Sequence, residues 1–138
     1  MRIDWIIPCR FVEIHDNLGT LVGAGSDTYW VAEFPAPVQV FLAMRFSAMQ
    51  DELGPDNPHT LRNLIRDTQG NVLSEMSGEI VAEGEQHKPE YLATIMLPTI
   101  AQFEAAEEGT YMLESDLDGE TNAVPIHVLQ GPPRAPGE

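Results

Sequence analysis

The sequence predicts an all-β fold, a β-sandwich of about eight antiparallel strands with at most a short helical turn. Apolar and polar residues alternate along most segments, which is the two-residue period of a strand. Glycine, proline, asparagine and aspartate recur between these segments, at the short spacing that is typical of sandwiches and barrels. Several segments are apolar on one face only, and this favours a sandwich.

The N-terminal segment predicts a strand that is interrupted in the middle. Apolar residues alternate along residues 3–14, but their phase changes at Pro8. Because proline cannot donate a ladder hydrogen bond, we expect a bulge or a switch between sheets there. The sequence HDNLG at 15–19 then predicts a tight turn, and residues 20–25 form the returning strand.

The clearest strand lies at residues 38–46, where one face is uniformly apolar. An irregular connection at 26–37 precedes it, and a loop rich in proline and glycine follows at 51–58. Further strands are predicted at 59–67, 72–81 and 91–97.

Residues 99–108 predict one or two helical turns, because Thr99 can cap a helix and Gln102 follows three positions later. The two segments after this one, at 110–117 and 120–129, predict a hairpin joined by Asp118-Gly119, which favours a type I′ turn. Pro125 places the last strand at a sheet edge. We expect one domain at 1–129 and a flexible Pro/Gly-rich tail at 130–138.

The charge balance is strongly acidic. Seven basic residues face 22 acidic ones, which gives a formal net charge of −15. Nucleic-acid binding and adsorption to anionic membranes are not expected, because both need clustered lysine and arginine. The excess acid has two interpretations: it maintains solubility, or it attracts a partner with a basic surface, including by imitating nucleic acid.

The predicted location is cytoplasmic. Cys9 is the single cysteine, so the fold needs no internal disulfide or oxidising compartment. The first ten residues lack the uninterrupted apolar run of a signal peptide, and no segment has the ~20 apolar residues that a membrane helix needs.

Three stretches carry a family resemblance. They are the N-terminal hairpin ending in LVGAG (21–25), the strand 38–46 followed by HTLRNLIRDTQGNV (59–72), and the segment 109–128. In this order the chain resembles a small bacterial and phage family of domains of unknown function, seen mainly in actinobacteria and their phages. The resemblance implies an immunoglobulin-like β-sandwich and brings no catalytic residues.

No motif predicts catalysis, a cofactor or a metal site. The run DLDGE at 116–120 is similar to a calcium loop, but its glycine comes too early and a hairpin turn explains it. The glycines at 19–25 precede neither a lysine nor a helical pattern, so they do not form a phosphate-binding loop. Cys9 on a half-buried strand is expected to be inert. The histidines are scattered without zinc-site spacing, at His15, His59, His87 and His127.

The aromatic residues Tyr29, Trp30 and Phe34 are the candidate interaction surface. They either cap the core or form an exposed binding surface, since tyrosine and tryptophan are favoured interface anchors. We therefore expect a non-enzymatic interaction module in which residues 29–34, alone or together with the 51–58 loop, contact a protein partner or a second copy in a homodimer. The alternatives are a phage structural or host-inhibiting acidic protein, and a metal-dependent enzyme whose ligands come together only in the fold.

Overall fold

The computed structural model describes residues 1–16, 18–83 and 92–131, and over these residues the chain forms ten strands and one short 3-10 turn at Gln50–Glu52. The all-β prediction is confirmed, and the predicted number of about eight strands is too low. The strands are β1 (Arg2–Cys9), β2 (Phe11–His15), β3 (Leu18–Val22), β4 (Thr28–Val31), β5 (Ala36–Ala48), β6 (His59–Arg66), β7 (Val72–Ile80), β8 (Ala93–Ala105), β9 (Gly109–Leu117) and β10 (Glu120–Gln130). None of the described segments forms a helix with the length and apolar character needed to cross a bilayer.

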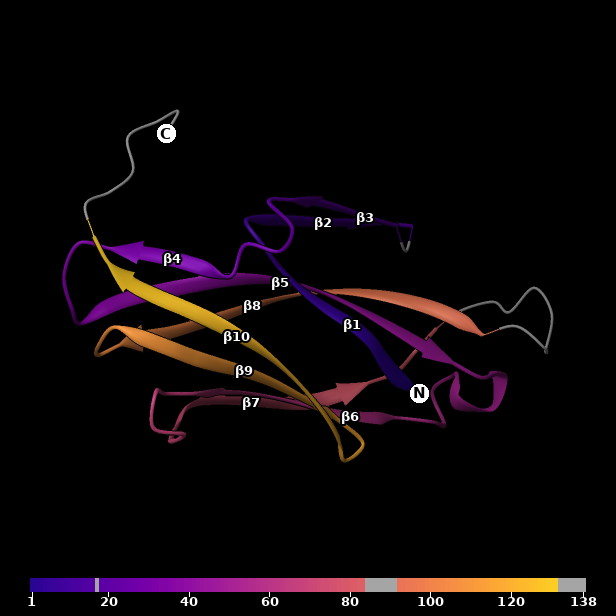
Figure 1. Ribbon diagram of the computed structural model, residues 1–138. Helices are drawn as coiled ribbons and strands as arrows, with labels where there is room; N and C mark the ends of the chain where they lie inside the picture. The colour runs from indigo at the N-terminus through magenta and orange to yellow at the C-terminus, as the bar shows by residue number, and fades with distance from the viewer. Residues whose placement is uncertain (17, 84–91, 132–138) are drawn as a thin grey trace.

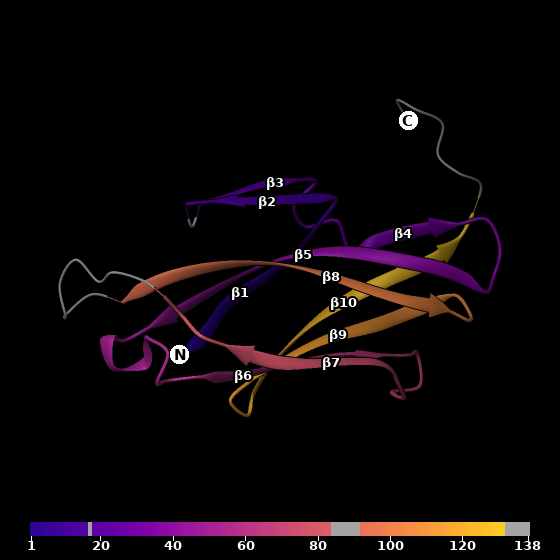
Figure 2. The same ribbon diagram turned by 180° about the vertical axis from the view of Figure 1, so that it is seen from behind.

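Two sheets form the body of the molecule. One has three strands in the order β1-β5-β8, and the other has five in the order β4-β10-β9-β6-β7. They lie as two layers, with hairpin β2–β3 outside the three-stranded layer (Figures 1 and 2). All pairings are antiparallel except that of β4 with β10, which is parallel.

The core lies between the two sheets. The predicted apolar face of the strand at 38–46 points inward, and its five members are at most 5% exposed: Val38, Val40, Leu42, Met44 and Phe46. From the five-stranded sheet, Tyr111, Leu113 and Ile126 pack against this face. Burial of each such aliphatic side chain contributes roughly 1.5–3 kcal/mol, so this contact holds the two layers together.

The N-terminal segment changes sheets, but it does so after Cys9 and not at the predicted Pro8, which pairs in register with Leu42. β1 pairs with β5, and after a single residue, Arg10, the chain enters β2 in a separate hairpin. The connection predicted as irregular contains the further strand β4, which pairs over four residues with the end of β10. So short a strand has too little alternation to be recognised, and its partner lies about a hundred positions away.

The helical turns predicted at 99–108 are wrong. β8 continues to Ala105, because thirteen of its residues pair with β5 from Ala48 back to Ala36. The hydrogen bonds of this long ladder pair the backbone N–H and C=O groups of the segment, and they outweigh the local capping pattern of Thr99 and Gln102.

The edge position predicted for the last strand is also wrong, since β10 lies between β4 and β9. Pro125 is nevertheless accommodated, because β4 begins to pair only at His127. On the side where Pro125 lacks an N–H, the strand therefore has no ladder partner at that position among the described residues.

The hairpin β2–β3 covers the outer face of the three-stranded sheet. A Cβ atom at Gly19 would lie 2.9 Å from Cε of Met96 on β8, so the backbone approaches the sheet too closely for a larger residue. Ala43, which points outward from β5, is fully buried. The outer face of this sheet is therefore partly a second interior.

Tyr111 joins the core to the turn between β8 and β9. Its hydroxyl donates a 2.7 Å hydrogen bond to the backbone carbonyl of Glu107. The centroids of the Tyr111 and Phe103 rings lie 5.0 Å apart. The side chain is 1% exposed, so this hydrogen bond is shielded from water.

We expect Tyr111→Phe to lower the free energy of unfolding by about 1–2 kcal/mol, because the Glu107 carbonyl loses its donor while the ring packing is kept. Urea denaturation of both proteins measures the difference. An unchanged midpoint would show that this hydrogen bond contributes nothing to stability.

Candidate functional site

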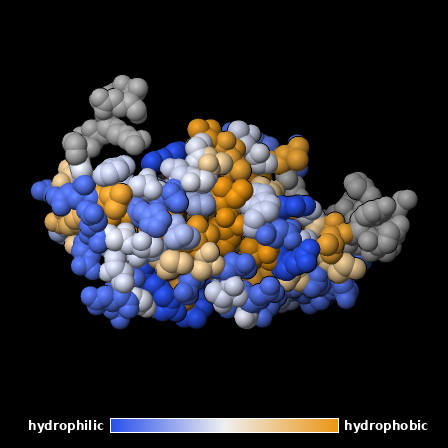
Figure 3. Space-filling model, in the orientation of Figure 1, coloured by the Kyte–Doolittle hydropathy of each residue, from blue (hydrophilic) through white to orange (hydrophobic). Residues whose placement is uncertain are grey.

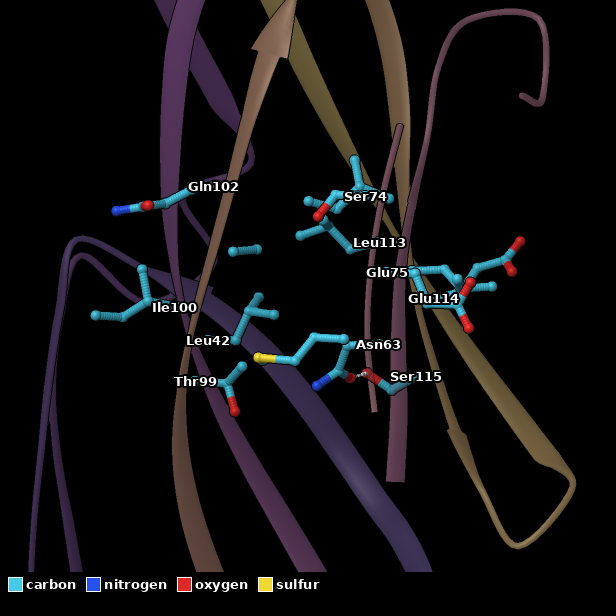
Figure 4. A pocket seen from close by; sticks show the side chains of 14 residues that line it. Leu42, Asn63, Ser74, Glu75, Thr99, Ile100, Gln102, Leu113, Glu114 and Ser115 are labelled. Atoms are coloured by element: carbon cyan, nitrogen blue, oxygen red, sulfur yellow. Dashed lines mark hydrogen bonds between the residues drawn. The ribbon is translucent and has the colours of Figure 1, made fainter. Parts of the chain in front are cut away.

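A groove runs between β7, at one edge of the five-stranded sheet, and β8, at the edge of the three-stranded sheet. Its main hollow has a volume of about 380 Å³ and a floor of core side chains that includes Leu42, Ile65 and Leu113 (Figure 4). A second hollow of about 210 Å³ continues it along β7 and shares the lining residues Asn63, Met76 and Thr99. Both hollows together are the β7–β8 groove.

The groove exists because the two sheets differ in width. β9 lies opposite the three-stranded sheet, and its inward side chains Tyr111 and Leu113 are 1% and 4% exposed. Met76 on β7 pairs in register with Asn63, and Asn63 pairs with the inward-facing Ser115, so all three side chains lie on the inner face of the sheet. Met76 is nevertheless 57% exposed. Three strands cannot cover five, so the inner face of β7 stays open.

The wall of the groove carries hydrogen-bonding groups. Ser115 Oγ donates to Asn63 Oδ1 over 2.6 Å, and Thr99 Oγ1 donates to the Met44 sulfur over 3.7 Å. In Figure 4 the amide nitrogen of Asn63 points into the hollow, and it has no hydrogen-bond partner among the described residues. This amide can therefore donate to an occupant of the groove.

The charged lining residues face away from the hollow. Figure 4 shows Glu75 and Glu114 pointing to the outside of the sheet. There Arg62 Nε donates to Glu75 over 2.5 Å and Arg66 Nε to Glu114 over 2.9 Å. The Arg62 hydrogen bond holds the pKa of the Glu75 carboxyl below its usual value. The hollow itself is thus apolar with neutral donors and acceptors, which suits binding better than proton transfer.

The three aromatic residues singled out from the sequence do not form one surface. Tyr29 and Phe34 pack against the core, and Arg10 lies 4.8 Å from the Tyr29 ring. The Tyr29 hydroxyl is buried without a hydrogen-bond partner in the described structure, and burial raises its pKa. Trp30 is 46% exposed, and its ring lies against the backbone of Gly131.

The 51–58 loop lies far from these aromatics. Residues 29–34 precede β5 and the loop follows it, so a strand of thirteen residues, about 40 Å, separates them. The two segments cannot form a single compact surface.

The residues considered for metal binding or catalysis have structural partners. Asp118 Oδ2 accepts a 2.6 Å hydrogen bond from His59 Nδ1, and Asp116 accepts from the Gly119 amide. Cys9 is buried, and burial raises the pKa of its thiol. The described residues include no group of three side chains placed to hold a metal ion, and His87 lies outside them.

A second apolar surface lies on the opposite side of the molecule. Figure 3 shows apolar side chains in a band that follows β1 and hairpin β2–β3. The most exposed members of the hairpin are Phe11, Leu18 and Val22. These side chains are exposed on the hairpin, whereas Met76 lines a hollow.

Sequence reasoning missed the groove. Its residues come from five separate strands, so no local pattern unites them. One available signal was the polar Asn63 and Ser115 at inward positions of otherwise apolar alternations.

Comparison with known proteins gives one family match. The profile described as "Family of unknown function (DUF6941)" matches residues 4–129. No curated protein matches the chain.

The His59–Asp118 contact predicts a pH-dependent stability. His59 Nε2 also lies 2.8 Å from the Glu52 carbonyl, so both ring nitrogens face acceptors and only the imidazolium satisfies both. Burial lowers the pKa of His59, but the hydrogen bonds to Asp118 and Glu52 outweigh this and raise it above its usual value. A raised folded pKa gives stability that is complete below the unfolded pKa of about 6.5 and is lost as the pH rises through the folded pKa.

The free energy of unfolding should therefore fall as the pH rises above about 6.5, and Asp118→Asn should flatten this slope. Asparagine tolerates the φ of +51° at this position, so the turn is kept. Urea denaturation at several pH values measures both proteins. Equal slopes would exclude the His59–Asp118 contact as the origin of the dependence.

Trp30→Ala should lower the unfolding free energy by less than about 1 kcal/mol, because the ring is half-exposed. Tyr29→Ala should cost about 2 kcal/mol, because it opens a cavity beside the core. Thermal and urea denaturation compare the two variants. The reverse order would assign Trp30 to the core.

Proposed function

The chain belongs to the family of unknown function DUF6941, and we propose that it is a non-enzymatic protein-binding module whose binding site is the β7–β8 groove. One observation carries this proposal: an apolar hollow lies between two strand edges that have no strand partner among the described residues. Strand edges bind other chains through backbone hydrogen bonds, and a hollow beside them selects side chains.

The shape of the groove favours a protein chain over a small molecule. The main hollow has a volume in the range of ligand pockets, but it opens lengthwise into the second hollow along β7. Met76 lines both hollows, and methionine is common at surfaces that adapt to a partner.

We also propose an immunoglobulin-like architecture. Strand orders β1-β5-β8 and β10-β9-β6-β7 correspond to A-B-E and G-F-C-C′ of that fold, with β4 as an N-terminal strand that crosses to the second sheet. Tyr111 near the start of β9 bonds the backbone four residues upstream, as in a tyrosine corner. The hairpin β2–β3 is an addition between the first two elements.

Of the three aromatic residues predicted as an interaction surface, we propose only Trp30 for that role, because Tyr29 and Phe34 pack against the core. Trp30 would form a secondary contact with a partner or with a second copy in a homodimer.

We place the module in the cytoplasm, and the free, buried thiol of Cys9 supports this location. The proposal includes neither nucleic acid nor membrane as a partner, which the net charge of −15 supports.

A second candidate function rests on that charge. In the bacterial or phage setting implied by the sequence resemblance, an acidic structural or host-inhibiting protein would bind a basic target over a broad surface. Such binding would weaken steeply with salt, because exposed charges are screened within ~8–10 Å at physiological ionic strength.

Met76→Lys should abolish capture of the partner from an extract of the source organism, because a charge would enter the apolar groove. Met49→Lys is the matched control, since Met49 is 42% exposed and lies outside the groove. Quantitative mass spectrometry of proteins retained by each immobilised variant measures the effect.

Partners lost with Met76→Lys and kept with Met49→Lys would support the groove as the binding site. Equal retention by both variants would contradict it. If all partners are instead released by moderate salt from both variants alike, the second candidate function is favoured.

A further inference from the structure

We propose that the β7–β8 groove receives an extended segment of a partner protein, which adds to β8 as a fourth strand and alternates apolar with cationic side chains. This inference rests on the proposed function and specifies the chemical class of its partner. Four features of the structure support it.

The first feature is the missing coverage of β7. A strand added to β8 would extend the order β1-β5-β8 by one position, opposite the uncovered inner face of β7. It would fill the hollow along its length and bury Met76, the most exposed apolar side chain of β7. An extended chain fits this site, because alternate side chains of a strand form a single row on its inward face.

The second feature is the open edge of β8, defined as its side away from β5. Proline fits a ladder only where its missing N–H faces away from the paired strand, so Pro98 fixes the phase of β8. Alternation then directs the N–H and C=O groups of Ile100, Gln102 and Glu104 toward the open edge. Pro37 agrees with this phase, because its register partner is Glu104.

These three residues offer backbone groups to a new strand. Within the described structure, none of the backbone hydrogen bonds outside the strand ladders involves them. β8 pairs there with β5 and with no other described strand. Unpaired groups along an edge are the template for strand addition.

The third feature is the lining that inward side chains of the added strand would meet. Leu42 and Leu113 form an apolar floor, and Met76 can fold over a new side chain. The free amide of Asn63 can donate one hydrogen bond at the wall. Medium-sized aliphatic side chains fit this lining, and a charged one does not.

The fourth feature is the charge that outward side chains would meet. They would stand beside Ile100, Gln102 and Glu104, and Glu104 has no ion pair in the described structure. The five described arginines are already engaged: four contact carboxylates, and Arg10 lies over Tyr29. With a net charge of −15, the chain attracts lysine and arginine from a partner, and it disfavours the β8 edge of a second copy as the added strand.

The test uses three capped nonapeptides and the full chain. VKVKVKVKV has the proposed alternation, VVKKVVKKV has the same composition without it, and VEVEVEVEV reverses the charge. Calorimetry measures affinity, and amide hydrogen exchange monitors Ile100, Gln102 and Glu104. We expect the first peptide to bind at least tenfold more tightly than the other two and to slow exchange at these three amides.

Two variants at one position separate the backbone from the side chain. Gln102→Pro removes the N–H at the open edge, as Pro98 already does four residues earlier, and should weaken binding at least tenfold. Gln102→Ala loses the same side chain, including its contact with Gln39, but keeps the N–H, and should bind within twofold of the native chain. Thermal denaturation of both variants verifies that each is folded.

Equal affinity of the two variants, or equal binding of the alternating and non-alternating peptides, would overturn the inference. Slow exchange of the three amides without peptide would also overturn it. Such protection would assign the edge to a second copy if it depends on protein concentration, and to the chain itself if it does not.

Failure here is distinguishable from failure of the proposed function. If Met76→Lys abolishes partner capture while the peptides do not bind, the groove binds protein by another mode and only the strand-addition inference fails. If Met76→Lys leaves capture intact, the groove is not the binding site and both fail.

Discussion

The structure depends on the packing of a three-stranded sheet against a five-stranded one. A sheet that is apolar on one face is stable only where another layer removes that face from water. The inward side chains of β5 meet those of β9 and β10, and there burial is nearly complete. The three-stranded sheet does not extend over β7, so inward-facing side chains of β7 such as Met76 are exposed. The groove is a direct consequence of this mismatch.

The open edge of β8 presents the usual risk of an unpaired strand, which is uncontrolled pairing with other chains. Two features limit that risk. Pro98 interrupts the row of N–H groups, and the net charge of −15 disfavours pairing of this edge with the same edge of an identical copy. Neither feature blocks a cationic segment that enters beyond Pro98. In the proposed strand addition, the acidic charge of the chain would therefore select a cationic segment at this edge.

Local patterns predicted the parts of the fold that are governed by neighbours in the sequence. The alternation at 38–46 gave the inward face of β5, and Asp118-Gly119 gave the β9–β10 turn, where both residues have positive φ. The same reasoning failed for β4 and for the second half of β8. Their conformation follows from pairing with β10 and β5, and a single-sequence pattern contains no record of a distant partner. The division of the aromatic residues between core and surface was undecided for the same reason, since it depends on what lies opposite each face of β4.

The sequence by itself determined an all-β chain, its principal turns, the apolar face of its central strand and its acidic character. These are local or summed properties, set by side-chain period, turn chemistry and composition. Only the tertiary structure decided how many strands stand in each sheet, and hence that β7 is uncovered and that β8 has an open edge. Strand neighbours are chosen by long-range hydrogen bonding and by the burial of whole faces. The candidate site arises where those choices leave one face without a partner.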